Sequence, residues 1–394
     1  MKKSIAKLFG ILTITSVLLS SCTTSEDNKS SSTFEINPSN FQGEINDGEV
    51  TLNSNTVYSL TGKLQINDGA SLIIPAGTKI QGVGGTSAYI AVAQGGKIFV
   101  NGTSTNPVVM TSASTNPQAG NWGGVVICGK APINRVTGGT STAQSEVADL
   151  VYGGTISNDN SGSIRYLRIE YAGAAFNTEK EFNGMSLFGV GSGTTIENVE
   201  CYHGADDGFE FFGGTVNTSN LISIGNEDDQ FDWTEGWSGT NTNWYGKLDF
   251  GKGNRGIEAD NFELGFANTP IANPTITNLT LIGPGSTADA TIFTENDGLK
   301  LRRGTKGIFT NIFLANWKTG FNVEHDECIA AVTAGTLKAT NVTFNSDVPN
   351  KAKGKTTIGT SADVNDVFTQ TTTATGAGNG IGTPAWASSW SVGF

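Results

Sequence analysis

The sequence predicts an all-β protein folded as a right-handed parallel β-helix, with a loop insertion rich in aromatic residues and a C-terminal cap. The composition, a repeated strand pattern and the spacing of that pattern support this fold class. Of 394 residues, 37% are hydrophobic and 15% charged, and 52 are glycine. Such a composition favours many short strands joined by tight turns over a helical or disordered chain.

One strand pattern places an apolar residue after a glycine, or once after a glutamine, followed by a polar and a second apolar residue. Successive first apolar residues are 24, 22, 26, 42 and 22 positions apart. Most of these intervals are typical of one β-helix coil, whereas a propeller blade needs roughly 40–50 residues. The long interval predicts a loop insertion within 262–296. The first apolar residues are Met185, Phe209, Phe231, Ile257, Leu299 and Phe321.

A second strand pattern places an asparagine before alternating apolar residues. Successive asparagines of this type are 22, 58, 33 and 30 positions apart, which agrees with the same coil register. Upstream, residues 60–82 show short alternating strands separated by Asn-Asp-Gly and Pro-Ala-Gly turns. The asparagines of this second pattern are Asn198, Asn220, Asn278, Asn311 and Asn341.

The first 22 residues are typical of a signal peptide rather than of folded structure. Three lysines precede an apolar stretch that is too short to span a bilayer. The following Leu-Ser-Ser-Cys resembles the bacterial lipobox, which implies cleavage before Cys22 and lipidation of its sulfur. A lipidated N-terminus carrying more than one acyl chain would anchor the protein stably to a membrane.

The remaining chain divides into three predicted parts. Residues 23–33 are polar and predicted to be a disordered tether, and residues 34–350 form the β-helix. Residues 351–394 lose the coil register, and we expect them to cap the open end of the solenoid through Trp386, Trp390 and Phe394.

Charge and cysteine content exclude some classes of function. The chain has 24 basic and 36 acidic residues, a net charge of −12, and no basic tract, which argues against nucleic-acid binding. Cys128, Cys201 and Cys328 follow the signal peptide without the spacing of a zinc site. Their odd number leaves at least one free thiol or an intermolecular bridge, and we expect small buried side chains.

Strand alternation converts the repeat into a map of the outer face. If the first apolar residues point inward, the next residue of each coil points outward. Glu210, Asp232 and Glu258 would then stand as stacked like charges on coils about 4.8 Å apart. Three partners could offset this repulsion: Lys300 and Arg302 in a salt-bridge ladder, bound Ca²⁺, or a cationic or polyhydroxylated ligand. The full outward column is Ser186, Glu210, Asp232, Glu258, Lys300 and Asn322.

Acidic turns precede these strands and are candidate metal ligands. Aspartate and asparagine favour turns through their own hydrogen bonds, so the turns alone explain part of this pattern. Adjacent acids on adjacent coils nevertheless suit Ca²⁺, although they match neither the EF-hand nor the nonapeptide calcium repeat. The candidate ligands are Asp206, Asp207, Asp228 and Asp229.

Aromatic residues gather around the expected loop insertion 234–248. If Trp237 and Trp244 are exposed beside the carboxylates, their rings would suit stacking on sugars. The alternative is that they pack this loop onto the solenoid.

Three segments of the chain resemble a known family. LIIPAGT at 72–78, the run 100–111 and NWGG at 121–124 are similar to uncharacterised β-helix surface lipoproteins of Bacteroidota with the pectate-lyase-like fold. The resemblance covers about residues 50–350 and implies fold rather than activity. Enzymes of that fold hold Ca²⁺ and a uronate on stacked acids and remove a proton with arginine or lysine. By this resemblance Asp260, Arg302 and Glu324 are candidate catalytic residues, with Arg302 as the base.

These observations lead to one favoured function and two alternatives. The favoured function is a non-catalytic outer-membrane lipoprotein, exposed at the cell surface, whose β-helix binds a glycan or an envelope protein. A Ser-Glu-Asp run at 25–27 resembles the acidic export signal of such lipoproteins. The alternatives are a Ca²⁺-dependent polysaccharide lyase or glycoside hydrolase, and an accessory lipoprotein of an outer-membrane transporter.

Overall fold

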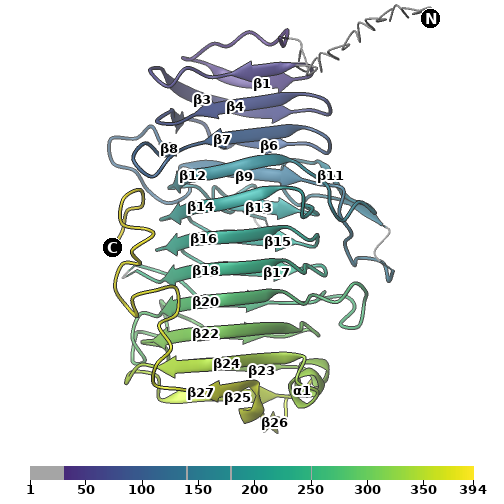
Figure 1. Cartoon of the computed structure of the whole chain (residues 1–394), viewed down its shortest axis with the longest axis vertical. Coiled ribbons are helices and arrows are strands. Elements are labelled where there is room, and N and C mark those ends of the chain that lie inside the picture. Colours follow the sequence, from purple (N-terminus) through teal and green to yellow (C-terminus); the bar gives the residue numbers. More distant parts are fainter. Residues whose placement is uncertain (1–30, 139–140, 178–179, 250) are drawn as a thin grey trace, which may run out of the picture.

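The chain folds into one long stack of parallel strands, which confirms the predicted β-helix (Figure 1). The computed structural model describes residues 31–138, 141–177, 180–249 and 251–394. The predicted signal peptide with Cys22, and residues 23–30 of the predicted tether, lie outside the described residues. Within the described ranges, no helix combines the length and apolar character needed to cross a membrane.

Two columns of parallel strands run the length of the stack. The first column is β1 (Phe41–Ile45), β3 (Val57–Ile66), β6 (Gly85–Val92), β9 (Trp122–Cys128), β13 (Met185–Phe188), β15 (Phe209–Phe212), β17 (Phe231–Thr234), β19 (Arg255–Ala259), β21 (Asp297–Leu301), β23 (Thr319–Glu324) and β25 (Asn350–Lys355). The second column is β2 (Glu49–Thr51), β4 (Ser71–Pro75), β7 (Lys97–Asn101), β12 (Gly162–Glu170), β14 (Thr195–Tyr202), β16 (Asn217–Ile224), β18 (Thr240–Lys247), β20 (Thr275–Ile282), β22 (Gly307–Ala315), β24 (Leu337–Phe344) and β27 (Phe368–Gln370).

The other elements complete the coils or cover the stack. Strands β5 (Lys79–Gly82) and β8 (Val108–Ser112) form a third side between β3 and β12. Strands β10 (Thr142–Gln144) and β11 (Val151–Gly153) form an antiparallel hairpin outside the solenoid. Near the C-terminal end lie α1 (Asp326–Thr333), β26 (Ser361–Ala362) and the 3-10 helix η1 (Asn365–Val367).

The asparagine repeat forms a hydrogen-bonded ladder at a bend in the second column. Each ladder asparagine has a positive φ between 57° and 63°, a conformation that asparagine tolerates better than most residues. The amide of Asn220 donates to Asn198 over 2.9 Å, and Asn243 donates to Asn220 over 2.8 Å. Asn278 and Asn311 continue the ladder. Asn243 fills the 58-residue gap in the sequence pattern.

The predicted inward column is confirmed. Met185 pairs with Phe209, Phe209 with Phe231, and Phe231 with Ile257, and all have no exposed surface. Burial of this repeated apolar slot is the main stabilising contribution of each coil, since one coil alone cannot cover it. The core is therefore a continuous column inside the solenoid.

The predicted aromatic loop insertion at 234–248 is wrong. Most of this segment is β18, a regular rung of the second column. Trp237 stacks on Phe211 with ring centroids 4.1 Å apart, and Trp244 stacks on Phe231 at 4.4 Å. The extra length in the predicted 262–296 insertion is confirmed, but it is divided between two turns on either side of β20.

The predicted C-terminal plug is also wrong for its aromatic residues. The segment after β27 runs back along the side of the stack (Figure 1, yellow). There Trp390 joins a buried cluster with Ile222 and Tyr245, because β16 and β18 present apolar side chains outward at this position. The end of the solenoid is closed by α1 and η1, whose Cys328, Val332 and Val367 belong to the main core.

The first described residues already contact the β-helix, and the three cysteines of the β-helix region are buried. Ser32 and Thr33 hydrogen bond to Asp47, so contact with the β-helix begins before the predicted boundary at residue 34. The prediction of small buried thiols is confirmed for Cys128, Cys201 and Cys328. Their burial raises the pKa of Cys128 and of Cys328 to about 12, which makes reactive thiolates unfavourable.

Candidate functional site

The outward column of the first sheet face is the centre of the candidate site. Glu210 pairs with Asp232 and Asp232 with Glu258 in the strand register, as predicted. Adjacent parallel strands are about 4.8 Å apart, so these carboxyl groups stand one above another. Lys300 follows Glu258 and Asn322 follows Lys300, while Ser186 precedes Glu210.

Two loops wall this column and enclose a cleft of about 270 Å³. One loop, 129–161, carries the β10–β11 hairpin, and the other, 260–274, follows β19. They bind each other: Asn134 Nδ2 donates to Asn261 Oδ1 over 2.8 Å, and the backbone N–H of Gly138 donates to the carbonyl of Thr269. The cleft is lined by Arg135, Glu146, Glu210, Phe212, Asp232, Thr234, Glu235, Glu258, Asp260, Phe262, Glu263, Leu264, Arg302 and Arg303.

An ion pair to a buried carboxylate fastens the 129–161 loop to the solenoid. Arg135 Nε and Glu235 Oε1 are 2.7 Å apart, and the hydroxyl of Tyr152 donates to the other oxygen of Glu235 over 2.7 Å. Only 2% of Glu235 is exposed. Because a buried carboxylate needs such partners, this wall of the cleft is held in one position.

One half of the acidic column is neutralised by cations. Arg255 Nη1 lies 2.9 Å from Asp229 Oδ2 and 2.8 Å from Glu258 Oε1. Arg302 contacts Glu258, and its Nε lies 2.7 Å from Asp260. These contacts confirm that Arg302 neutralises Glu258, as predicted, and show that Arg255 is a second neutralising partner.

Lys300 does not join the expected salt-bridge ladder with the carboxylates of the outward column. Its Nζ lies 2.5 Å from Glu295 instead of bonding to Glu258. Burial by itself would raise the pKa of Glu295, but Arg255 and Lys300 outweigh it and hold that pKa at about 2. Arg303 contributes a further cation, with Nη1 2.7 Å from Asp260.

Glu210 and Asp232 of this column, together with three aspartates of the preceding turns, have no cationic partner among the described residues. Among the described residues, no lysine or arginine forms an ion pair with the five carboxylates that we call the unpaired cluster. The few hydrogen bonds to it come from neutral groups: Asn183 Nδ2 donates to Glu210 over 2.6 Å, and the Asp229 N–H donates to Asp207 over 2.8 Å. The unpaired cluster is Asp206, Asp207, Glu210, Asp228 and Asp232.

Burial and mutual repulsion change the acidity of this cluster. The pKa values of Asp207, Glu210 and Asp232 are raised well above the ordinary range, first by loss of hydration and then by neighbouring carboxylates. The pKa of Asp206 is raised for the same two reasons. In the folded protein, the negative charge of this cluster must therefore be reduced either by bound protons or by bound cations.

The geometry of the cluster is compatible with bound cations. Carboxylate oxygens of Asp206, Asp207 and Asp228 lie within 4.8 Å of one another, as do those of Asp207, Glu210 and Asp232. Such sets of oxygen ligands suit hard cations such as Ca²⁺. Three of the four predicted metal ligands thus lie together. The fourth, Asp229, belongs to a separate group with Asp232 and Glu258.

The three candidate catalytic residues are not brought together. Asp260 and Arg302 are in contact, but Glu324 lines a different hollow with Asp297 and Lys353. Burial alone would lower the pKa of Arg302, but Asp260 and Glu258 outweigh it and raise the pKa further. Arg302 is therefore a poor proton acceptor in this arrangement.

The two tryptophans proposed to bind sugars are also in the wrong place for that role. Trp237 and Trp244 have no exposed surface and belong to the main core. Their ring faces are used by Phe211 and Phe231, so the alternative that they pack against the solenoid is correct.

Several site residues were missed by reasoning from sequence. Arg255 occupies the slot two positions before the inward apolar residue, where Asp207 and Asp229 lie on the preceding coils, so extending the repeat would have found it. Arg135 and Glu146 come from a loop without periodicity, and nothing in the local sequence marks them. Burial raises the pKa of Glu146 to about 7, with Glu235 acting in the same direction and Lys180 opposing.

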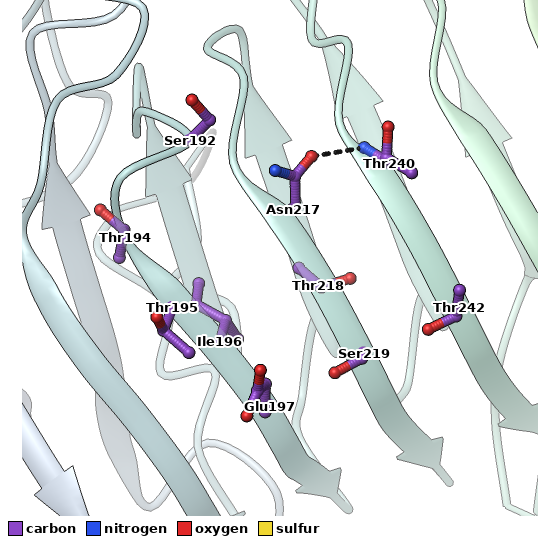
Figure 2. Close-up of a pocket in the computed structure, with 10 residues that line it drawn as sticks. All are labelled: Ser192, Thr194, Thr195, Ile196, Glu197, Asn217, Thr218, Ser219, Thr240 and Thr242. Atoms are coloured by element: carbon purple, nitrogen blue, oxygen red, sulfur yellow. Dashed lines mark hydrogen bonds between the residues drawn. The ribbon is translucent and has the colours of Figure 1, made fainter.

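A second hollow lies on another face of the solenoid and lacks this charge pattern. It has a volume of about 330 Å³ and runs across β14, β16 and β18 (Figure 2). Its lining is mostly threonine, serine and asparagine, and Thr240 N–H donates to Asn217 over 2.7 Å. Glu197 is its single charged lining residue. The acidic cleft is therefore the stronger candidate for a specific site.

Comparison with known proteins agrees with this architecture. Residues 43–391 match the family model described as a pectate-lyase like beta helix domain. The chain belongs to this family. No curated protein and no solved structure matches the chain. Membership of the pectate-lyase-like family establishes the fold of nearly the whole chain, and a fold by itself does not specify an activity.

Replacing Glu210 by glutamine should stabilise the cation-free protein, and more strongly at higher pH. Because the pKa of Glu210 is raised by burial and by its neighbours, the folded state keeps protons that the unfolded chain releases above about pH 4. Stability therefore falls as pH rises, and glutamine removes one contributor to that fall. Denaturant unfolding in EDTA should show a gain larger at pH 8 than at pH 5 by about 1 kcal/mol or more.

Glu197→Gln is the matched control because its carboxylate is exposed and paired with Arg165 on the other face, where an ion pair contributes little. It should give no pH-dependent gain. Equal gains for the two variants, or a loss for Glu210→Gln at pH 8, would contradict the assignment of repulsion to the outward column.

Proposed function

We propose that this protein is a non-catalytic binding protein that holds Ca²⁺ on the unpaired cluster and a glycan in the adjoining cleft. The observation that carries the proposal is the unpaired cluster, in which carboxylates without cationic partners among the described residues lie together, with Asp207 buried and the others partly buried. An unneutralised group of this kind costs stability, so its presence favours a ligand that supplies positive charge.

The lining of the cleft supports a glycan as the second ligand. Leu264 is 82% exposed at the cleft, next to the nearly buried Phe262. The guanidinium groups of Arg302 and Arg303 and the carboxylate of Glu146 line the same space. Apolar surface beside several hydrogen-bonding groups suits a sugar, which has apolar ring faces and a hydroxyl rim.

The state of the arginines supports binding rather than cleavage. A lyase needs an unpaired base facing the ligand, whereas Arg302 contacts both Glu258 and Asp260. In this proposal the arginines hold the ligand and the walls of the cleft in place, and no bond of the glycan is broken.

Glycoside hydrolysis is a second candidate, and Glu146 is the observation that favours it. With a pKa of about 7, this carboxyl group carries a proton for part of the time at neutral pH. A protonated Glu146 could protonate a leaving group, while a second carboxyl group that lines the cleft acts as base or nucleophile once it is ionised.

We also propose that the protein is attached to the outer membrane and faces the cell surface. The support is the resemblance of residues 19–22 to a lipobox and of residues 25–27 to an export signal. A lipid anchor on Cys22 would place the β-helix beside envelope glycans and outer-membrane proteins, which are the partners that we expect.

Calcium should stabilise the purified protein against heat, because a ligand that binds only the folded state shifts unfolding by mass action. At a free Ca²⁺ concentration of one hundred times Kd the gain is about 2.7 kcal/mol, and EDTA should reverse it. Asp232→Asn should reduce the gain, because it removes a ligand from one of the two carboxylate groups of the cluster. Asp366→Asn, an exposed aspartate in η1, should keep it. The readout is the unfolding midpoint with and without Ca²⁺.

The Ca²⁺-loaded protein should also bind to polysaccharides immobilised on an array. It should produce no new reducing or unsaturated ends in them. Absence of any Ca²⁺ effect would contradict the proposed cation. New reducing ends that disappear in Glu146→Gln would instead establish the hydrolase.

Replacing Cys22 by alanine should move the protein out of the membrane fraction, because the thiol that carries the lipid is lost. Ser21→Ala is the matched control, since it keeps the cysteine. Fractionation with incorporation of labelled fatty acid provides the measurement. Membrane attachment of the Cys22→Ala protein equal to wild type would rule out the lipid anchor.

A further inference from the structure

The chain after β27 forms a strap that binds coils far from it in the sequence. Residues 371–394 run back along the side of the stack, from β24 past β22, β20 and β18 to β14 (Figure 1, yellow). On this path the N–H groups of Thr375 and Ala377 donate to Asn311 and Thr280, over 3.0 Å and 2.9 Å. The strap therefore connects coils that are not neighbours, whereas a coil of a plain solenoid contacts only the next ones.

The far end of the strap rests on a buried carboxyl group. Glu200 of β14 has no exposed surface, and the N–H of Val392 donates to both of its oxygens, over 3.0 Å and 3.1 Å. We propose that residues 371–394 are a detachable clasp and that Glu200 is the catch that holds its end closed. Neither Glu200 nor the clasp lines the acidic cleft, so this device is separate from the proposed binding site.

Apolar packing holds the rest of the clasp end. Trp390 is 1% exposed and packs in one cluster with Ile222 and Tyr245, which point outward from β16 and β18. Glu200 pairs with Ile222 in the strand register, so the covered carboxyl group adjoins the covered apolar face. Lifting the end of the clasp would therefore bring water to both.

The charge state of the catch depends on whether the clasp covers it. Loss of hydration raises the pKa of Glu200 to about 8, and Glu170 acts in the same direction. The Val392 N–H and Arg168 oppose this rise without cancelling it. Once the clasp is lifted and the group is hydrated, its pKa returns to the ordinary value of about 4.3. The closed clasp thus favours the protonated carboxyl group, and the open clasp favours the carboxylate.

A guanidinium beside the catch can stabilise the open state. Arg168 of β12 pairs with Glu200 in the strand register. Its Nη2 lies 2.9 Å from Glu170, while its Nε is buried without a hydrogen-bond partner. An ionised Glu200 that is no longer held by Val392 gains this Nε as a donor. The open state therefore has its own partner for the carboxylate, as a two-state element requires.

The other titratable groups around the catch do not change charge near neutral pH. The pKa values of Cys201 and Tyr202, on the same strand, are raised above their usual range, mainly by burial. Lys247 of β18 donates to the carbonyl of Gly393 over 3.4 Å and so holds the clasp end through a group that stays charged. The terminal carboxylate of Phe394 is ionised throughout this range.

The clasp should therefore open more readily as pH rises. Between about pH 4.3 and 8 the closed state binds a proton that the open state has released, so rising pH favours opening. The ratio of open to closed molecules should increase about tenfold for each pH unit from about pH 5 to 8 and become constant above that range.

Hydrogen–deuterium exchange of the purified protein in EDTA, read by mass spectrometry on a peptide from residues 386–394, tests this inference. After correction for the intrinsic exchange rate at each pH, the wild-type peptide should show the tenfold rise per pH unit. Glu200→Gln cannot ionise, so its clasp should stay closed without pH dependence. Glu197→Gln is the matched control, because this residue lies on the same strand and pairs with Arg165. It should keep the wild-type slope.

A peptide from β22 in the core reports unfolding of the whole protein and should exchange more slowly than the clasp. Exchange of the clasp peptide at its intrinsic rate at every pH would show that the segment is not docked and would overturn the clasp. A protected peptide without pH dependence, or a slope that persists in Glu200→Gln, would overturn Glu200 as the catch. If Glu200→Gln does not fold, the wild-type profile decides: exchange of the clasp and β22 peptides in parallel would contradict separate opening.

Discussion

The repetition of one slot on every coil is the constraint on which the rest of this structure depends. Parallel strands place equivalent residues about 4.8 Å apart. A residue in a repeated slot therefore contacts residues of the same type on the coils above and below it. Apolar residues gain from this stacking by burial. Asparagines gain as well, because an amide both donates and accepts, and the ladder through Asn220 and Asn243 satisfies itself. Ionised carboxylates only accept, so a column of them needs donors or cations from elsewhere.

The protein meets that need in two ways along one column. Towards the C-terminal end, Lys300 occupies the same slot and arginines occupy neighbouring slots, and Arg255 and Arg302 both contact Glu258. Towards the N-terminal end, the one side-chain donor to Glu210 within the described part of the chain is the neutral amide of Asn183. The change between the two halves occurs beside the cleft, where two long loops meet. Cationic side chains of the chain itself thus neutralise one half of the column and not the other. Such an arrangement is expected of a site that is completed by a ligand.

The regular part of this arrangement could be predicted from sequence, and the irregular part could not. The spacing from Met185 to Phe321 predicts the strand register and therefore the stacked carboxylates, because alternation within a strand is fixed. Alternation does not hold at turns. Glu235 and Gly236 both have positive φ, and the following Trp237 lies in the core, whereas the strand alternation alone does not predict whether its side chain points inward or outward. Ion pairs such as Arg135–Glu235 join residues 100 positions apart through a loop without periodicity. No local pattern carries that information.

The central claim is that cations, rather than protons, neutralise the unpaired cluster under working conditions. Anomalous diffraction from crystals grown with Ca²⁺ near neutral pH tests it most directly, since it locates ions by element. If cations neutralise the cluster, anomalous peaks will lie among the carboxylate oxygens of Asp206, Asp207 and Asp228, or among those of Asp207, Glu210 and Asp232. Density without such peaks, together with short oxygen–oxygen contacts between these carboxyl groups, would show that protons are shared instead and would contradict the account.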